Sequence, residues 1–330
     1  TLVAGIVAGQ PGADAFSGVA PAARLLSIRQ TSAHYDPQTT SDDPGRARAI
    51  REVDALARAI VLAADQGARV ITVPAATCLP ADEPVDHTTL GAAIGYAAVQ
   101  RDAVIVAAAG DTGVPGAGPA CAANPLTDPS RPDDPRNWAG VTSVSVPSWW
   151  QPHVLSVGSV TPGGQPSSFT MPGPWVGIAA PGEEIVSVGN GDAALVAGIP
   201  GYNGKLIPIQ GTRYAAAYVA GVAALVRSRF PELSAAQVID RISRTARNPA
   251  RSPSNLVGAG VVDPLAALTW ELSAPGREMP RMPLPPAPAP VDMTPRIVAF
   301  GGAAVLAISV LATVLVLTRR GDDQETDDMA

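Results

Sequence analysis

The chain has 330 residues, of which 46 % are hydrophobic and 16 % are charged. This composition excludes global disorder, and the length fits one large domain or two smaller ones. The formal net charge is −6 and the chain has a single lysine, which argues against a nucleic-acid-binding protein. Two cysteines in so long a chain exclude a disulfide-rich scaffold and a zinc finger.

The first half of the chain alternates amphipathic helices with short apolar strands. The spacing of apolar residues predicts helices over 51–66 and 88–100. Each helix is followed by an apolar run that is typical of a buried strand, at 70–73 and at 104–110. Such alternation predicts an α/β fold, with a parallel sheet covered by helices on both faces.

The same pattern continues in the second half. Apolar runs predict strands at 154–160 and 175–180, and a helix of small residues begins near 213. Ser234, followed three residues later by Gln237, forms a capping box that predicts the start of another helix.

The C-terminal part differs sharply from this body. Residues 274–295 hold eight prolines, which predicts a semi-rigid extended stalk. Residues 297–318 carry no charge and as a helix would span about 33 Å, enough for a bilayer core. We therefore predict a body at 1–273, a stalk at 274–295, a transmembrane helix at 296–318 and an acidic tail at 319–330.

The charges beside the span predict its orientation. Arg319 and Arg320 follow it directly, so the tail is expected in the cytoplasm and the body outside, on a single-pass protein of the cell membrane. In an oxidising compartment, Cys78 and Cys121 are expected to form one disulfide; two free buried cysteines are the alternative.

One motif in the second half suggests a family. Residues 211–221, GTRYAAAYVAG, resemble the motif of the subtilase family of serine proteases, in which Gly-Thr-Ser opens a helix of small residues. Five further blocks resemble that family in the same order, and the resemblance covers about residues 1–270: TLVAGIVAG at 1–9, GVAPAARLLSIR at 18–29, VIVAAAGD at 104–111, VLSVGSV at 154–160 and AAPGEEI at 179–185.

Within the subtilases, the chain looks most like the mycosins, the membrane-anchored members associated with mycobacterial type VII secretion. The C-terminal span, the position of Cys78 and the sequence AGDTG at 109–113 carry this finer resemblance. It implies a subtilisin-like sheet, incomplete at its N-terminus because the family's catalytic Asp and His would precede residue 1. It also implies type VII secretion membrane components as partners. No cofactor is expected, and no metal either: some subtilases bind calcium, but the sequence shows no Asp, Asn and Glu cluster with the spacing of a calcium loop.

The catalytic positions that remain depart from the family pattern. Arg213 stands at the position of the nucleophilic serine, after Gly211 and Thr212, and Ala217 replaces the usual proline. Asp111 stands at the position of the amide that stabilises the oxyanion. One interpretation is that these two opposite charges pair across the site; two independent, solvated side chains are the alternative.

The three histidines, His34, His87 and His153, lie in loop-like sequence and are expected at the surface. The sequence therefore favours a catalytically inactive mycosin-like protein that acts as a structural component of the secretion machinery. A fragment of a serine endopeptidase that cleaves secreted proteins and the product of a decaying gene remain the alternatives.

Overall fold

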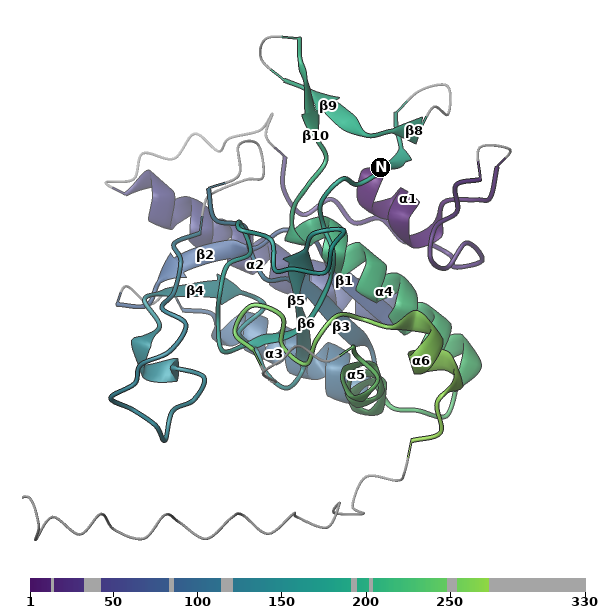
Figure 1. Ribbon diagram of the computed structural model, residues 1–330. Coiled ribbons are helices and arrows are strands. Elements are labelled where there is room, and N and C mark those ends of the chain that lie inside the picture. Colours follow the sequence, from purple (N-terminus) through teal and green to yellow (C-terminus); the bar gives the residue numbers. More distant parts are fainter. Residues whose placement is uncertain are drawn as a thin grey trace, which may run out of the picture. The chain divides into compact units, whose positions relative to one another are not determined.

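The computed structural model describes residues 1–272, except 13–14, 33–42, 83–85, 114–120, 191–194, 202–203 and 248–253. Residues 1–272 form one compact unit (Figure 1). The predicted stalk, span and tail lie outside the described residues. Within the residues that are described, no helix is long and apolar enough to cross a membrane.

A parallel sheet of four strands forms the centre of the unit. Its order is β1 (Val70–Val73), β3 (Val104–Ala108), β5 (Val154–Val160) and β6 (Val176–Pro181), and every neighbouring pair is parallel. All residues of β3 and β5 are buried, which explains why these strands are continuously apolar instead of alternating. This confirms the predicted α/β fold and its sheet.

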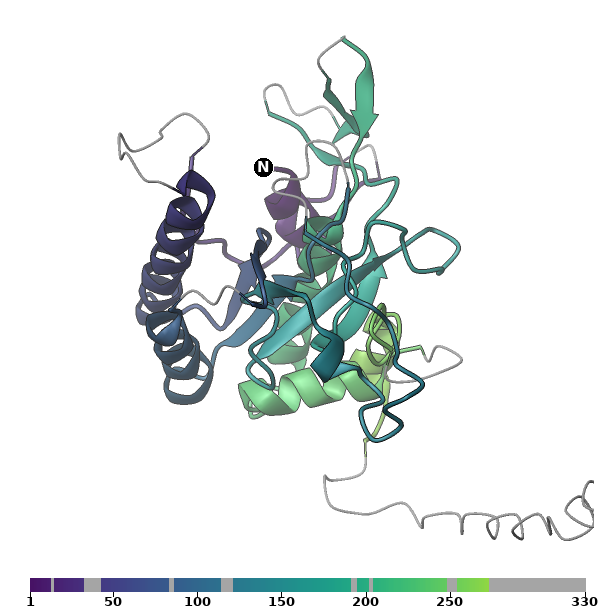
Figure 2. The ribbon, with the colours of Figure 1, turned by 90° about the vertical axis from the view of Figure 1, so that its left-hand side faces the viewer.

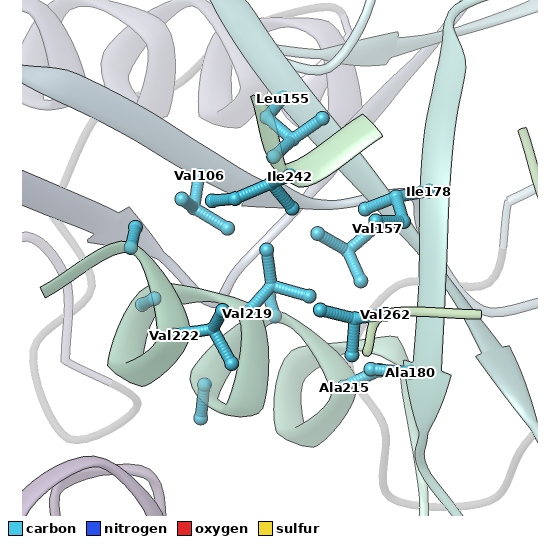
Figure 3. Packing of buried hydrophobic residues seen from close by; sticks show 14 of the residues in the cluster. Val106, Leu155, Val157, Ile178, Ala180, Ala215, Val219, Val222, Ile242 and Val262 are labelled. Atoms are coloured by element: carbon cyan, nitrogen blue, oxygen red, sulfur yellow. The ribbon is translucent and has the colours of Figure 1, made fainter. Parts of the chain in front are cut away.

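Helices cover both faces of the sheet (Figure 2). On one face, α2 (Pro44–Asp65) and α3 (Thr88–Gly95) pack against Ile71, Val73 and Ile105. On the other face, α4 (Thr212–Arg229) and α5 (Ala235–Arg244) pack against Val106, Val157 and Ile178 (Figure 3). The capping box of Ser234 and Gln237 is present at the start of α5, as predicted.

Shorter elements surround this core. The sequence predicted none of the antiparallel pairs, because none of their strands has more than four residues. The remaining elements are α1 (Leu2–Ala8), β2 (Thr77–Pro80), the π-helical turn η1 (Tyr96–Gln100), the 3₁₀ turn η2 (Trp138–Gly140), β4 (Ser143–Val146), β7 (Ser187–Val188), β8 (Leu195–Val196), β9 (Gly198–Pro200), β10 (Leu206–Pro208) and α6 (Pro264–Thr269).

Cys78 and Cys121 form the predicted disulfide, with their Cα atoms 5.4 Å apart. Cys78 lies in β2, which pairs with β4, and Cys121 lies in the long segment that follows β3. The bond therefore ties that segment to the edge of the β2–β4 pair.

Reduction of this disulfide should lower the free energy of unfolding. The bond closes a loop between residues 43 apart, and the loop-entropy estimate for that length is about 4 kcal/mol. Urea unfolding of the full chain, followed by tryptophan fluorescence with and without reductant, measures the loss. A Cys78→Ser, Cys121→Ser variant should unfold like the reduced protein and be insensitive to reductant. Equal stability of the oxidised and reduced proteins would contradict the prediction.

Candidate active site

The end of β3 and the start of α4 meet at two glycines. Gly110, two residues beyond β3, has φ of +105°, and Gly211, directly before α4, has φ of +141°. Both values lie where side chains are strongly disfavoured. A Cβ atom on Gly211 would lie only 2.8 Å from Oδ2 of Asp111. The two segments can therefore approach so closely only because position 211 is glycine.

Two hydrogen bonds join the segments. The backbone N–H of Thr212 donates to Oδ1 of Asp111 over 2.7 Å, and the backbone N–H of Gly110 donates to Oγ1 of Thr212 over 3.2 Å. Thr212 is 1 % exposed and Asp111 9 %. Since the first N–H groups of a helix have no partner within it, the Asp111 carboxylate acts as a cap for α4 that comes from another element.

Burial raises the pKa of Asp111, while the hydrogen bonds from Thr212 and the positive charge of Arg213 lower it; burial outweighs them. A Cβ atom on Gly211 would lie 2.8 Å from Oδ2 of Asp111 and 3.7 Å from Nε of Arg213. The structure therefore brings the two predicted residues together around Gly211. The hydrogen bond from Thr212 to Asp111 was not predicted. The signal for it was the pair Gly110-Asp111 shortly after the buried strand β3.

The helix behind this site is built from small residues. Ala215, Ala216 and Ala217 are fully buried, and Ala217 occupies the position of the family's proline. A Cβ on Gly221 would lie 2.6 Å from Cβ of Val19, so α4 passes very close to the segment that follows α1. Small side chains thus allow α4 to lie directly against its neighbours, as the motif predicted.

The disulfide supports the opposite side of the site. The backbone N–H of Cys121 donates to the carbonyl of Asp111 over 3.2 Å. Sγ of Cys121 lies 3.0 Å from the point that a Cβ on Gly110 would occupy. The bond between Cys78 and Cys121 therefore fixes the backbone that presents the Asp111 carboxylate.

Hydroxyl groups near the start of α4 are buried and engaged in hydrogen bonds. Oγ1 of Thr212 accepts from Gly110. Ser159 and Ser167 share a hydrogen bond of 2.8 Å and are 0 % and 2 % exposed. None of these three hydroxyl groups is placed to attack a substrate from solvent.

The described histidines lie elsewhere. His87 immediately precedes α3, and its ring packs edge-on against Trp149 and Trp150, with centroids 5.2 and 5.9 Å apart. His87 is half-buried and its Nδ1 is fully buried, so the expectation of a surface residue holds only in part. His153 is half-buried in the turn before β5, so it is partly exposed, and His34 lies outside the described residues.

Over the described part of the chain, no group of three or more His, Cys, Asp or Glu side chains could hold a metal ion. The site therefore consists of a buried carboxylate, a helix N-terminus and an arginine. Such a set can hold charge, and neither the helix N-terminus nor the arginine supplies a hydroxyl or thiol nucleophile.

Replacing Asp111 should change how stability depends on pH. Because its pKa in the folded state is raised above the ordinary 3.8, the folded protein binds a proton more tightly than the unfolded chain. Stability should therefore fall as pH rises from about 3.8 through the folded-state pKa. Asp111→Asn keeps an acceptor for the N–H of Thr212, but its side chain does not titrate, so this dependence should be lost. The stability of Asp111→Asn relative to the unsubstituted protein should therefore rise with pH. Urea unfolding at several pH values measures the difference, and parallel curves for the two proteins would contradict it.

Asp111→Ala serves as the matched control for the hydrogen bond. It should lose about 1 kcal/mol relative to Asp111→Asn, as other helix caps do. Equal stability of these two variants would show that the bond to Thr212 contributes nothing.

Comparison with known proteins identifies the family. The sequence profile of the subtilase family matches residues 1–260. Mycosin-3 of Mycobacterium tuberculosis is 62 % identical over 98 % of this chain and 72 % of its own length. Mycosin-5 of the same organism is 47 % identical over 95 % of this chain, which spans only 55 % of that relative.

Solved structures agree with this assignment. The MycP3 protease from the type VII (ESX-3) secretion system superposes with a TM-score of 0.78 at 61 % identity, covering 82 % of this chain and 72 % of that one. A chain of the intact ESX-5 inner membrane complex gives a TM-score of 0.79 at 45 % identity, covering 96 % of this chain and 77 % of its own. The chain belongs to the subtilase family and, within it, is similar to the mycosins of type VII secretion.

Proposed function

We propose that this chain is a non-catalytic mycosin that serves as a structural component of a type VII secretion assembly at the cell membrane. The observation that carries the proposal is the buried carboxylate of Asp111, which accepts the N–H of Thr212 next to an arginine at the nucleophile position. In a serine protease this place needs a hydroxyl nucleophile and donors for the developing oxyanion.

The chemistry of each residue supports this view. The guanidinium of Arg213 stays protonated at any physiological pH and has no lone pair with which to attack a carbonyl. An ionised Asp111 would repel an oxyanion, where a donor usually contributes about 3–4 kcal/mol. A protonated Asp111 could donate a hydrogen bond, but position 213 would still offer no nucleophile.

Two observations support the structural role: similar chains occur in solved secretion complexes, and the C-terminal sequence contains a long uncharged run. A similar chain occurs in the structure of the periplasmic assembly of the ESX-5 inner membrane complex, with a TM-score of 0.80 and 46 % identity. The uncharged run at 297–318 provides the means of anchoring a body to the membrane. We propose that the body packs with other membrane components of such a machine on the outer side of the membrane.

A second candidate function is proteolysis of secreted proteins, with this chain as part of a larger endopeptidase. The similarity to a structure described as a protease favours it. In that case a serine-directed reagent would find a nucleophile in the folded protein.

Fluorophosphonate labelling distinguishes the two functions. The full chain should remain unlabelled, with trypsin as the positive control. Arg213→Ser, alone or combined with Asp111→Asn, should also remain unlabelled and should hydrolyse no peptide. The reason is that triad members act as a unit, and neither described histidine, His87 or His153, lies at the start of α4 to serve as a base for a serine there. Labelling of the unsubstituted chain would overturn the proposal.

The proposed topology is tested on cells stripped of their wall. Protease added from outside should digest the body and leave an epitope on residues 319–330 protected. Permeabilised cells provide the control, because both parts should then be digested. A body protected in sealed cells would reverse the assignment.

A further inference from the structure

Helices α2 and α3 enclose a groove on the outside of the unit. Figure 2 shows α2 along the left-hand side of the unit. The groove has a volume of about 540 Å³ and a mainly apolar lining. Ala57 of α2 and Ala93 of α3 line it and are only 2 % and 4 % exposed, so its floor consists of small side chains. Such a floor allows another helix to approach closely, at about 8 Å between the helix axes.

Larger apolar side chains beside this floor remain in contact with water. Leu62 lines the groove and is 48 % exposed, and Val61 next to it is half-buried. Val99 belongs to η1, which continues directly from α3, and is 66 % exposed. Exposed apolar surface around an apolar groove is typical of an interaction site.

Charged residues lie on α2 before and after the apolar pair. Arg58 and Asp65 both line the groove. They are seven residues apart, which is about two turns and about 10 Å along the helix, so they share one face. Within the described chain, neither residue makes an ion pair. Oδ1 of Asp65 accepts a hydrogen bond from the hydroxyl of Tyr96, which holds this carboxylate at its end of the groove.

This arrangement of charges is complementary to itself when the helix is reversed. A twofold axis between Val61 and Leu62 would bring two copies of α2 together in antiparallel orientation. Arg58 of each copy would then lie opposite Asp65 of the other. Between these two ion pairs, Val61 of each copy would lie opposite Leu62 of the other. A single contact would thus cover the exposed apolar side chains and give both charges an opposite partner.

We propose that the groove between α2 and α3 binds α2 of a second copy of this chain, in an antiparallel twofold dimer. The charges favour this occupant over others, because a helix of one charge sign or a lipid chain would leave Arg58 or Asp65 without an opposite charge. The contact uses no residue of the candidate active site, so the inference does not depend on whether the chain is catalytic.

Charge reversal tests the register of this dimer. Light scattering measures the mass of the full chain in mild detergent as a function of protein concentration, and we expect an equilibrium of monomer and dimer. Arg58→Asp should raise the dissociation constant about tenfold or more, because two pairs of like charges would face each other, and Asp65→Arg should do the same. The double variant Arg58→Asp, Asp65→Arg should restore association. Since the two residues lie two turns apart in one copy, this rescue requires the second copy.

Arg244→Asp provides the matched control, because it reverses a charge on α5 and should leave the dissociation constant unchanged. Circular dichroism shows whether each variant is folded. Asp65→Arg also loses the hydrogen bond from Tyr96, whereas Arg58 is exposed, so Arg58→Asp tests the contact by itself.

Three results would overturn the proposal. A monomer at every concentration would leave the groove to a different protein or to lipid. A dimer that neither single reversal weakens would place the contact elsewhere, such as in the apolar run at 297–318. Loss of association in the single variants without restoration in the folded double variant would exclude the antiparallel register.

Discussion

The fold around the candidate site depends on how closely the start of α4 approaches the end of β3. Gly110 and Gly211 both adopt backbone angles that disfavour a side chain, and any Cβ at 211 would meet the Asp111 carboxylate. The alanines of α4 extend this close approach along the sheet. A substitution of Gly211 would therefore affect the packing of α4 as well as the site.

That constraint explains why the charged residues of the site are tolerated. A buried carboxylate is costly unless it is hydrogen bonded. The N-terminus of α4 provides both an N–H donor and a favourable dipole field for Asp111, and Arg213 adds a positive charge. These contacts offset part of the cost of burying the carboxylate, although burial still raises the pKa of Asp111 above its ordinary value.

Local patterns in the sequence predicted the elements that bury a continuous apolar face. Strands β1 and β5 have the predicted bounds, and α4 and α5 begin where the small-residue motif and Ser234 indicated. Helix α2 begins seven residues earlier than predicted, at Pro44, because Asp43 caps it and its first turns are polar. The pair of β2 with β4 joins residues such as Thr77 and Val146, whose contact no local pattern encodes.

The sequence predicted which residues form the site but only some of their contacts. The motif identified Arg213 and Asp111, but the partner of the carboxylate is a backbone group, and backbone groups are the same for every residue type. The amide of Thr212 therefore offers the most direct test, because its ¹⁵N–¹H resonance reports on the Asp111 carboxylate. The account predicts that this resonance shifts with pH, with an apparent pKa above 3.8, and that the shift is lost in Asp111→Asn. A Thr212 resonance that is insensitive to both pH and this substitution would contradict it.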